Sequence, residues 1–253
     1  MRLGNKVAIV TGAGSGFGAG IASRFAQEGA KVVVNDIDAA AGERVAEAIR
    51  EAGGSAQFLQ ADVTRDADWA RLAQGAQSQF GRLDVVVNNA GWTHRKKPFL
   101  EVTEVEFDRV YAVNVKSVYL SARHVLPVFR RQGGGCIVNI ASTAGLRPRP
   151  GLIVYNSSKA AVILMSKAMA GEFGPDKVRV NCVNPVFSPE TALSAEFAGG
   201  AITPEVRAAY LATIPLGRFS TPLDVANACL YLASDEASMI SGVCIEVDGA
   251  RCV

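Results

Sequence analysis

The amino-acid sequence predicts a single α/β domain built on a doubly wound parallel sheet of about seven strands, with helices on both faces. Two observations predict this fold. Short β-branched runs alternate with longer helical patterns along all 253 residues, and such alternation implies right-handed crossovers within a parallel sheet. Several of these runs are apolar throughout, as strands buried on both faces must be.

The strand candidates are short apolar runs at 6–10, 31–35, 56–60, 83–88, 136–140, 178–183 and 243–247. The helical candidates between them lie at 16–28, 38–52, 66–80, 104–130, 152–173 and 222–233. Two helix starts carry their own signals: TEVE at 103–106 has the form of a capping box, and TPLD at 221–224 places Pro at a first helical position. No repeat, low-complexity stretch or linker interrupts the chain, so we expect one domain over residues 1–253.

The stretch 186–214 fits no strand. It is punctuated by Pro and Gly, and its apolar residues are scattered. A long excursion of this kind in a compact domain is usually a lid or a binding loop. We therefore expect it to lie over a site.

Composition excludes several classes of function. The hydrophobic fraction is 49% and the formal net charge is +2, which argues against a broad nucleic-acid-binding face. No apolar run reaches the length of a membrane span, and the N-terminus has no signal-peptide pattern. The cysteines are odd in number and have no disulfide or zinc spacing, which fits a reducing compartment; they are Cys136, Cys182, Cys229, Cys244 and Cys252. We expect a soluble cytoplasmic protein that binds neither nucleic acid nor membranes.

A glycine-rich turn joins the first predicted strand to the first helix. Gly12, Gly16 and Gly18 lie in it with the spacing G-x-x-x-G-x-G. Glycines let a backbone approach a pyrophosphate closely, and the helix that follows offers free N–H groups and its positive dipole end. The turn therefore indicates a dinucleotide site, although a tight strand-to-helix turn without a ligand is the alternative.

Asp36 ends the second predicted strand, 24 residues after Gly12. A carboxylate there can accept hydrogen bonds from both ribose hydroxyls of NAD, and it repels the 2′-phosphate of NADP. Ser15 and Phe17 occupy the turn positions where an Arg or Lys would bind that phosphate. We therefore predict NAD rather than NADP, with Ser15, Phe17 and Ile37 among its contacts; a solvated loop aspartate is the alternative.

When the glycine turn and Asp36 are considered together with further motifs, the chain resembles the short-chain dehydrogenase/reductase family over essentially its full length. The resemblance is carried by TGAGSGFG at 11–18, DV at 62–63, NNAG at 88–91, Asn114, Ser142, YNSSK at 155–159, NP at 184–185 and the segment 221–250. It implies a Rossmann-type fold, reversible hydride transfer between a nicotinamide and a carbinol carbon, and a homotetramer.

The resemblance also implies roles for single residues. Asp62 and Val63 would hold the adenine ring, while the turn under the cofactor would contain Asn88, Ala90 and Gly91. The catalytic residues would be Asn114, Ser142, Tyr155 and Lys159, the last two also touching the cofactor. In NPVFSPETAL, Val186 replaces the family's usual glycine, and the expected threonine comes one position late. Pro185 and Thr191 are carried over as cofactor contacts.

Tyr155 and Lys159 stand one helical turn apart, on the same face. Free tyrosine has a pKa of about 10, and a nearby ammonium lowers it, which would tune a general acid/base. We expect Tyr155 to take the hydroxyl proton in oxidation and to return it in reduction. Ser142, at the end of the fifth predicted strand, would hydrogen-bond the substrate oxygen, and Asn114 would hold a water in a proton relay.

Substrate selection is expected from the excursion and the loops after NNAG and Ser142. Phe187, together with Leu193, Phe197 and Tyr210, would give an apolar wall. The predicted substrate contacts are Ser142, Trp92, His94, Arg147, Leu152 and Phe187. The basic run at 94–98 and the pair Arg147 and Arg149 are either anion sites or exposed loop charges.

The chain is therefore predicted to be an NAD-dependent dehydrogenase of small secondary alcohols that also reduces the matching ketones. A 3-oxoacyl-carrier ketoreductase using NADPH is the main alternative, with Arg130, Arg131 and Lys177 as its carrier surface. A non-catalytic dinucleotide sensor is disfavoured because all four catalytic residues are present. A serine hydrolase would need a G-x-S-x-G elbow, and a metal site would need a ligand-spaced partner for His94 or His124.

Overall fold

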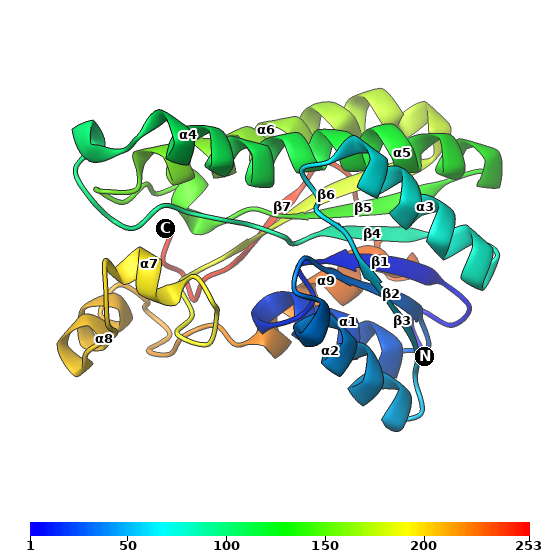
Figure 1. Ribbon diagram of the computed structural model, residues 1–253, viewed down its shortest axis with the longest axis horizontal. Coiled ribbons are helices and arrows are strands. Elements are labelled where there is room, and N and C mark those ends of the chain that lie inside the picture. The colour runs from blue at the N-terminus through cyan, green and yellow to red at the C-terminus, as the bar shows by residue number, and fades with distance from the viewer.

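The computed structural model describes all residues from 1 to 253 and contains one parallel sheet of seven strands (Figure 1). The strands are β1 (Val7–Thr11), β2 (Lys31–Asp36), β3 (Ser55–Gln60), β4 (Val85–Asn88), β5 (Gly135–Ile140), β6 (Val178–Pro185) and β7 (Cys244–Val247). Their order in the sheet is β3-β2-β1-β4-β5-β6-β7. The predicted fold class and all seven predicted strands are confirmed.

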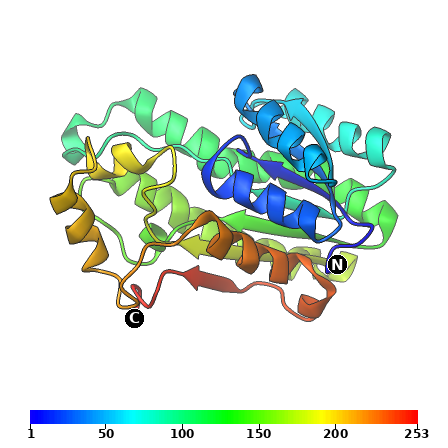
Figure 2. The same ribbon diagram turned by 90° about the horizontal axis from the view of Figure 1, so that it is seen from below.

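Helices cover both faces of the sheet (Figures 1 and 2). One face carries α1 (Gly16–Gln27), α2 (Ala39–Glu51) and α9 (Pro222–Ala233), and the other carries α3 (Asp66–Phe80), α5 (Ser117–Gln132) and α6 (Ile153–Phe173). The strands alternate between two buried clusters, with Ala8 and Val10 in one and Val7 and Ile9 in the other. This alternation, apolar on both sides, explains why the sequence pattern reads as continuous hydrophobic runs.

The helix predicted over 104–130 is interrupted in the structure. α4 (Glu104–Tyr111) is followed by a π-helical turn over Ala112–Lys116 and then by α5. Such a π turn inserts one residue into the helical ladder, commonly at functional sites, and this one contains Asn114. Both predicted helix starts are confirmed: Thr103 and Glu106 form a capping box before α4, and Thr221 and Asp224 form one before α9.

The 186–214 excursion contains two short helices, α7 (Ser194–Ala198) and α8 (Pro204–Leu211). Thr203 caps α8 by accepting from Val206 N. Phe187 stacks on Tyr210 with ring centroids 4.1 Å apart, and its edge meets Phe219. The excursion lies beyond the carboxyl ends of the strands, beside the C-terminus (Figures 1 and 2). No helix in the chain is long and apolar enough to cross a lipid bilayer.

The direction of winding reverses between β1 and β4, which are neighbours in the sheet although β1 also pairs with β2. Ligands of open α/β sheets bind in the crevice at such a switch point, at the carboxyl ends of the strands. β1 and β4 end at Thr11 and Asn88, so the sheet places the glycine turn and the NNAG segment side by side.

Trp69 is a core residue whose hydrogen bond connects the core to Val63, at this edge of the sheet. Its side chain is fully buried, and its indole N–H donates to Val63 O at 3.0 Å. Trp69→Phe removes ring volume and leaves the Val63 carbonyl without its donor, so we expect the free energy of unfolding to fall by about 1–3 kcal/mol. Urea denaturation monitored by circular dichroism measures the change.

Trp92 provides the matched control because it is the second of the chain's two tryptophans and lies only partly buried at the cleft. Trp92→Phe should change the stability by less than about 0.5 kcal/mol. Equal stabilities for the two variants would contradict the role given to Trp69.

Candidate active site

Glycines at the end of β1 bring three backbone segments into contact. A Cβ on Gly18 would lie 2.2 Å from the carbonyl oxygen of Gly12, and one on Gly12 would lie 2.8 Å from Ala90 Cα. Gly12 also has a φ of 60°, which favours glycine. The turn therefore packs so tightly that only glycine fits at these two positions, and a backbone without side chains is what close approach to a pyrophosphate requires.

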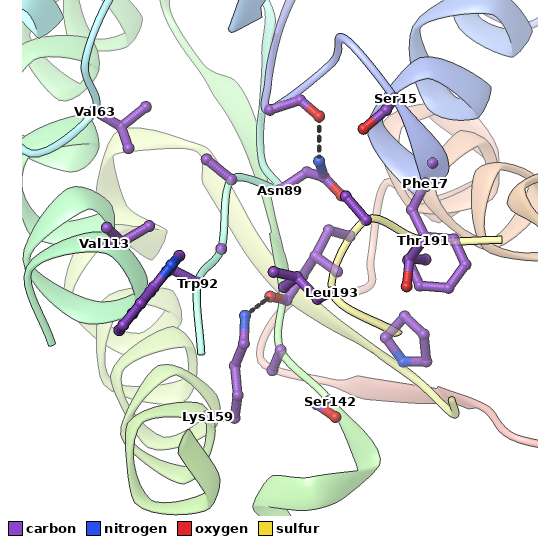
Figure 3. A pocket seen from close by; sticks show the side chains of 18 of the residues that line it. Ser15, Phe17, Val63, Asn89, Trp92, Val113, Ser142, Lys159, Thr191 and Leu193 are labelled. Carbon is purple, nitrogen blue, oxygen red and sulfur yellow. Dashed lines mark hydrogen bonds between the residues drawn. The ribbon is translucent and has the colours of Figure 1, made fainter. Parts of the chain in front are cut away.

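Asn89 locks the two sides of this turn together. Its Nδ2 donates to the carbonyl oxygens of Thr11 and Gly12 at 2.9 and 3.0 Å. Figure 3 draws one of these two hydrogen bonds from the Asn89 amide. In return, Thr11 Oγ1 accepts from the backbone N of Asn89 and Ala90. Asn89 lines the cleft, and its place in NNAG is the signal by which the sequence could have identified it.

A cleft of about 320 Å³ opens at this edge of the sheet. Most of the predicted site residues line it: Gly12, Ser15, Gly16, Phe17, Asp36, Ile37, Asp62, Val63, Ala90, Gly91, Trp92, Ser142, Tyr155, Lys159, Pro185, Phe187 and Thr191. Residues from the ends of β2, β5 and β6, from the segments that follow β1 and β4, from α6 and from the excursion thus meet in one cavity.

Asp36 is held in the cleft by backbone donors. Its Oδ2 accepts from Gly14 N at 2.8 Å, and its Oδ1 accepts from Asp38 N at 3.0 Å. A Cβ on Gly14 would lie 2.8 Å from Oδ2, so this glycine allows the contact. Among the residues that line the cleft, the basic side chains are those of Arg109 and Lys159. Neither of the two is adjacent in sequence to Asp36 or to the glycine turn.

Ser142, Tyr155 and Lys159 come together on the other side of the cleft. Ser142 follows β5, and its Oγ accepts from Ala144 N at 3.1 Å, which leaves the hydroxyl proton available to an oxygen in the cleft. Lys159 Nζ donates to the carbonyl oxygen of Ile140 at 2.8 Å (Figure 3). Tyr155 is buried, and the edge of Phe197 packs on its ring with centroids 4.9 Å apart.

Burial dominates the protonation of this pair. It raises the pKa of Tyr155 to about 12, against the opposing effects of the Ser142 hydroxyl and the Arg149 guanidinium. Burial also lowers the pKa of Lys159 to about 8. The expected lowering of the tyrosine pKa by Lys159 is not found here, because the ammonium faces the Ile140 carbonyl and lies 5.8 Å from the centroid of the phenol ring.

Three predicted residues lie beneath the cleft rather than in its wall. Asn88 is buried and donates to Asn139 Oδ1 at 2.8 Å, because the alternation of β4 points its side chain to the face of the sheet that α6 covers. Gly18 lies in the first turn of α1, against the Gly12 carbonyl. Asn114 donates to Trp92 O and to Ser158 Oγ, and it accepts from Trp92 N. Asn114 thereby holds the backbone after NNAG against α6.

Three predicted substrate contacts do not reach the cleft wall. His94 is buried, with Nδ1 at 2.8 Å from Arg95 O, because the loop turns inward after Trp92. Leu152 is buried against Ala144 and Tyr155. Arg147 is exposed, and its guanidinium donates to the carbonyl oxygen of Arg251. The predicted contacts Trp92, Phe187 and Ser142 do line the cleft.

The basic run at 94–98 ties the loops to one another. Arg95 Nε donates to Gly199 O at 2.7 Å, and Lys97 pairs with Glu106 at 2.7 Å. These contacts join the segment after NNAG to the excursion and to α4. The run therefore serves the packing of the lid, and its charges are not arranged around the cleft.

Further wall residues were missed by the sequence reasoning, among them Arg109 and Val113 from the helix that precedes the π turn and from the turn itself. The Arg109 guanidinium stacks on the ring of Trp92, 4.4 Å from its centroid. No sequence signal marks these two positions, since the π turn that orients them is not encoded in a recognisable motif. Thr191 closes the cleft from above: its Cγ2 would lie 3.6 Å from a Cβ on Gly16.

Comparison with known proteins agrees with this geometry. A family described as enoyl-(acyl carrier protein) reductase matches residues 12–250. The chain is 53% identical over 251 residues to 4-formylbenzenesulfonate dehydrogenase of Comamonas testosteroni, covering 99% of both chains. It is 38% identical over 250 residues to cyclopentanol dehydrogenase of the same species, covering 98% of this chain and 97% of that protein.

Among solved structures, 3-ketoacyl-(acyl-carrier-protein) reductase from Brucella melitensis complexed with NADH superposes with a TM-score of 0.92. The two chains are 44% identical, and the match covers 99% of this chain and all of that one. These matches span nearly the whole chain, including the glycine turn, the other segments that line the cleft and the 186–214 excursion. The chain therefore belongs to the short-chain dehydrogenase/reductase family of oxidoreductases.

Proposed function

We propose that this protein is an NAD-dependent oxidoreductase that transfers a hydride between the nicotinamide and the carbinol carbon of a secondary alcohol, with Tyr155 as general acid/base. One observation carries the proposal: Ser142, Tyr155 and Lys159 line the same cleft as Asp36 and the glycine turn. The dinucleotide site and the proton-transfer groups thus share one cavity, as hydride transfer coupled to proton transfer requires.

Ser142, Tyr155 and Lys159 have different roles in the proposed reaction. The nicotinamide, when bound, accepts the hydride in oxidation and supplies it in reduction. Ser142 donates its hydroxyl proton to the substrate oxygen and stabilises charge there. Tyr155 takes the proton of the alcohol in oxidation and returns a proton to the substrate oxygen in reduction. Its high pKa keeps the phenol protonated at neutral pH, as the reduction requires. Lys159 is fixed on the Ile140 carbonyl and lines the cleft, where its ammonium would hold the ribose of a bound dinucleotide.

The preference for NAD rests on Asp36. Its carboxylate is fixed by two backbone donors and occupies the end of β2, where the ribose hydroxyls of a dinucleotide would lie. The structure of the NADH-bound relative supports the same cofactor. The names of the relatives describe substrates built on rings, cyclopentanol and a formylbenzene, which supports a ring-bearing substrate for this chain.

A second candidate is the reduction of 3-oxoacyl chains on a carrier protein, favoured by the name of the structural relative. Its predicted basic surface does not support it. Arg130 and Arg131 end α5 and Lys177 precedes β6, so all three lie at the amino edge of the sheet, opposite the cleft. Arg130 is also paired with Asp176 at 2.9 Å. We therefore favour a free small-molecule alcohol or ketone.

We further propose a homotetramer in a reducing, cytoplasmic compartment. Exposed apolar side chains on three neighbouring helices support self-association, among them Phe107 on α4, Tyr119 on α5 and Leu164 on α6. All five cysteines are free thiols, which fits a reducing environment.

Removal of the Tyr155 hydroxyl tests the acid/base. Tyr155→Phe should lower kcat with NAD and a secondary alcohol by about 10²–10⁴-fold while leaving NAD binding within about twofold, because the proton has no acceptor. Steady-state kinetics and equilibrium NAD titration measure the two effects. Tyr111→Phe is the matched control, since Tyr111 bonds only Ser157 at 3.0 Å, and it should retain full activity. Substantial turnover by Tyr155→Phe would refute the assignment.

The pKa of Tyr155 gives a pH prediction. With a pKa of about 12 the phenol is protonated at neutral pH, so kcat/KM for oxidation should rise between about pH 6 and pH 10, and kcat/KM for reduction should not. The Ser142 hydroxyl lowers this pKa, so Ser142→Ala should move the oxidation profile to higher pH. Parallel pH profiles of the two directions measure it. An oxidation rate independent of pH over this range would contradict the account.

Neutralising Asp36 tests the cofactor preference. Asp36→Asn keeps the size of the side chain and removes the charge that repels a 2′-phosphate. The ratio of kcat/KM with NAD to that with NADP should therefore fall about ten- to a hundredfold. Asp38→Asn is the control two residues away, because asparagine preserves its helix cap on Ala41. An unchanged ratio in Asp36→Asn, or a wild-type preference for NADP, would overturn the assignment.

A further inference from the structure

Two cysteines lie side by side at one edge of the sheet. Cys182 in β6 and Cys244 in β7 are register partners in the parallel pairing of these strands, so their side chains point to the same face. The next pair along, Val183 and Ile245, packs into the cluster on the opposite face, whereas both cysteines pack into the cluster that α6 covers. β7 is the outermost strand on this side of the sheet (Figure 2).

This placement meets the geometric requirement of a disulfide. Neighbouring strands lie roughly 4.8 Å apart, and the Cα atoms of disulfide-bonded cysteines lie about 4.4–6.8 Å apart. Cys182 is fully buried, whereas Cys244 is partly exposed on the outermost strand. A small oxidant can therefore reach Cys244 without unfolding of the sheet, and Cys182 lies directly beside it.

The two thiols differ in reactivity. A hydrogen bond from the Cys182 thiol, assisted by the charge of Lys167, lowers the pKa of Cys244 against the opposing effects of burial and Glu246. The same hydrogen bond, together with burial, raises the pKa of Cys182. Because the thiolate is the reactive form of cysteine, Cys244 is the thiol that an oxidant attacks first, and Cys182 is placed to react with the product.

A row of polar side chains connects this pair to the cleft. The register pairs run from Asn88 through Asn139 and Cys182 to Cys244, across β4, β5, β6 and β7. Asn88 donates to Asn139 Oδ1, and Asn139 donates to Ser166 Oγ on α6, at 2.8 Å each. The Ser166 hydroxyl also forms a hydrogen bond with the Cys182 thiol. Asn88 directly precedes the residue that locks the glycine turn, so a shift of Cys182 is coupled to the dinucleotide site.

We propose that Cys182 and Cys244 form a reversible disulfide on exposure to hydrogen peroxide, and that this bond weakens dinucleotide binding by displacing the Cys182 end of the polar row. The disulfide itself goes beyond the proposed function, whereas its effect on the cleft rests on it. Disulfides in reducing compartments are usually transient and redox-sensing, and partly exposed ones are the labile ones.

The chemistry balances with hydrogen peroxide as the oxidant. The Cys244 thiolate attacks one peroxide oxygen, the O–O bond breaks, hydroxide leaves, and Cys244 becomes a sulfenic acid. The Cys182 sulfur then attacks the Cys244 sulfur; the S–O bond breaks, the S–S bond forms and water leaves. The two cysteines together lose two electrons, which reduce the peroxide. Exchange with an added dithiol returns both thiols.

Peroxide treatment of the reduced enzyme tests the proposal. The oxidised chain should lose two of its five free thiols, and peptide mass spectrometry after alkylation should find Cys182 linked to Cys244. Calorimetric titration should show NAD binding weakened about two- to tenfold, the change expected when about one hydrogen bond is lost. Dithiothreitol should restore both the thiols and the affinity.

Three variants separate this pair from the other cysteines. Cys244→Ser should lose no thiol pair, and its NAD affinity should not respond to peroxide. Cys182→Ala leaves Cys244 without a partner, so the sulfenic acid should persist and react with dimedone. Cys252→Ser is the matched control, because Cys252 is the other partly exposed cysteine, and it should form the bond as the wild type does.

An unchanged thiol count, or a link between two copies of the chain on a non-reducing gel, would overturn the disulfide. A bond that forms within the chain but leaves NAD affinity unchanged would overturn its effect on the cleft. Absence of NAD binding in both the reduced and the oxidised enzyme would instead count against the proposed function, and the thiol count would still decide whether the bond forms.

Discussion

The site depends on the contact between the carboxyl ends of β1 and β4, which we call the seam. There, Asn89 donates to the Thr11 and Gly12 carbonyls while the Thr11 hydroxyl accepts from the segment that follows β4. This exchange joins two strands whose connections wind in opposite directions, and it holds the glycine turn against Ala90 at a distance that admits no Cβ. The dinucleotide cleft exists because these two backbones cannot move apart without losing four hydrogen bonds.

Beside this seam, a chain of hydrogen bonds connects the segment after NNAG to the helix that carries Tyr155 and Lys159. Asn114 binds both backbone groups of Trp92 and reaches Ser158, whose hydroxyl donates to the carbonyl oxygen of Tyr155. The π turn is what aims Asn114 at these partners. Because Asn114 and Ser158 are buried, their hydrogen bonds are costly to leave unmade, so α6 is held in register with NNAG. The positions of Tyr155 and Lys159 follow from this register, and their shifted pKa values follow from the burial that it imposes.

Much of this could be predicted from the sequence, for identifiable reasons. Most of the strands could be predicted because the inner ones, such as β1 and β4, are apolar on both faces. The glycine turn, Asp36 and the Tyr155–Lys159 pair could be predicted because their spacing is local. What failed depended on tertiary packing. The π turn has no residue signature, and loops turn His94 and Leu152 into the interior. Asn88 was predicted to line the cleft, but its neighbour Asn89 lines it instead, because the alternation of side chains along β4 decides which of the two faces the cleft. The hydrogen bond from Arg147 to the carbonyl oxygen of Arg251 joins positions about a hundred residues apart, which no local pattern could reveal.

The central claim is direct hydride transfer from a carbinol carbon to the dinucleotide held in this cleft. The most direct test is to oxidise a secondary alcohol deuterated at the carbinol carbon, with NAD in ordinary water, and to analyse the reduced nicotinamide by mass spectrometry. If the hydride is transferred directly, the deuterium appears in the nicotinamide product and the alcohol-derived ketone has lost it. Reduced nicotinamide without deuterium, with the label released to water, would contradict the account, because the hydrogen would then have left the carbon as a proton.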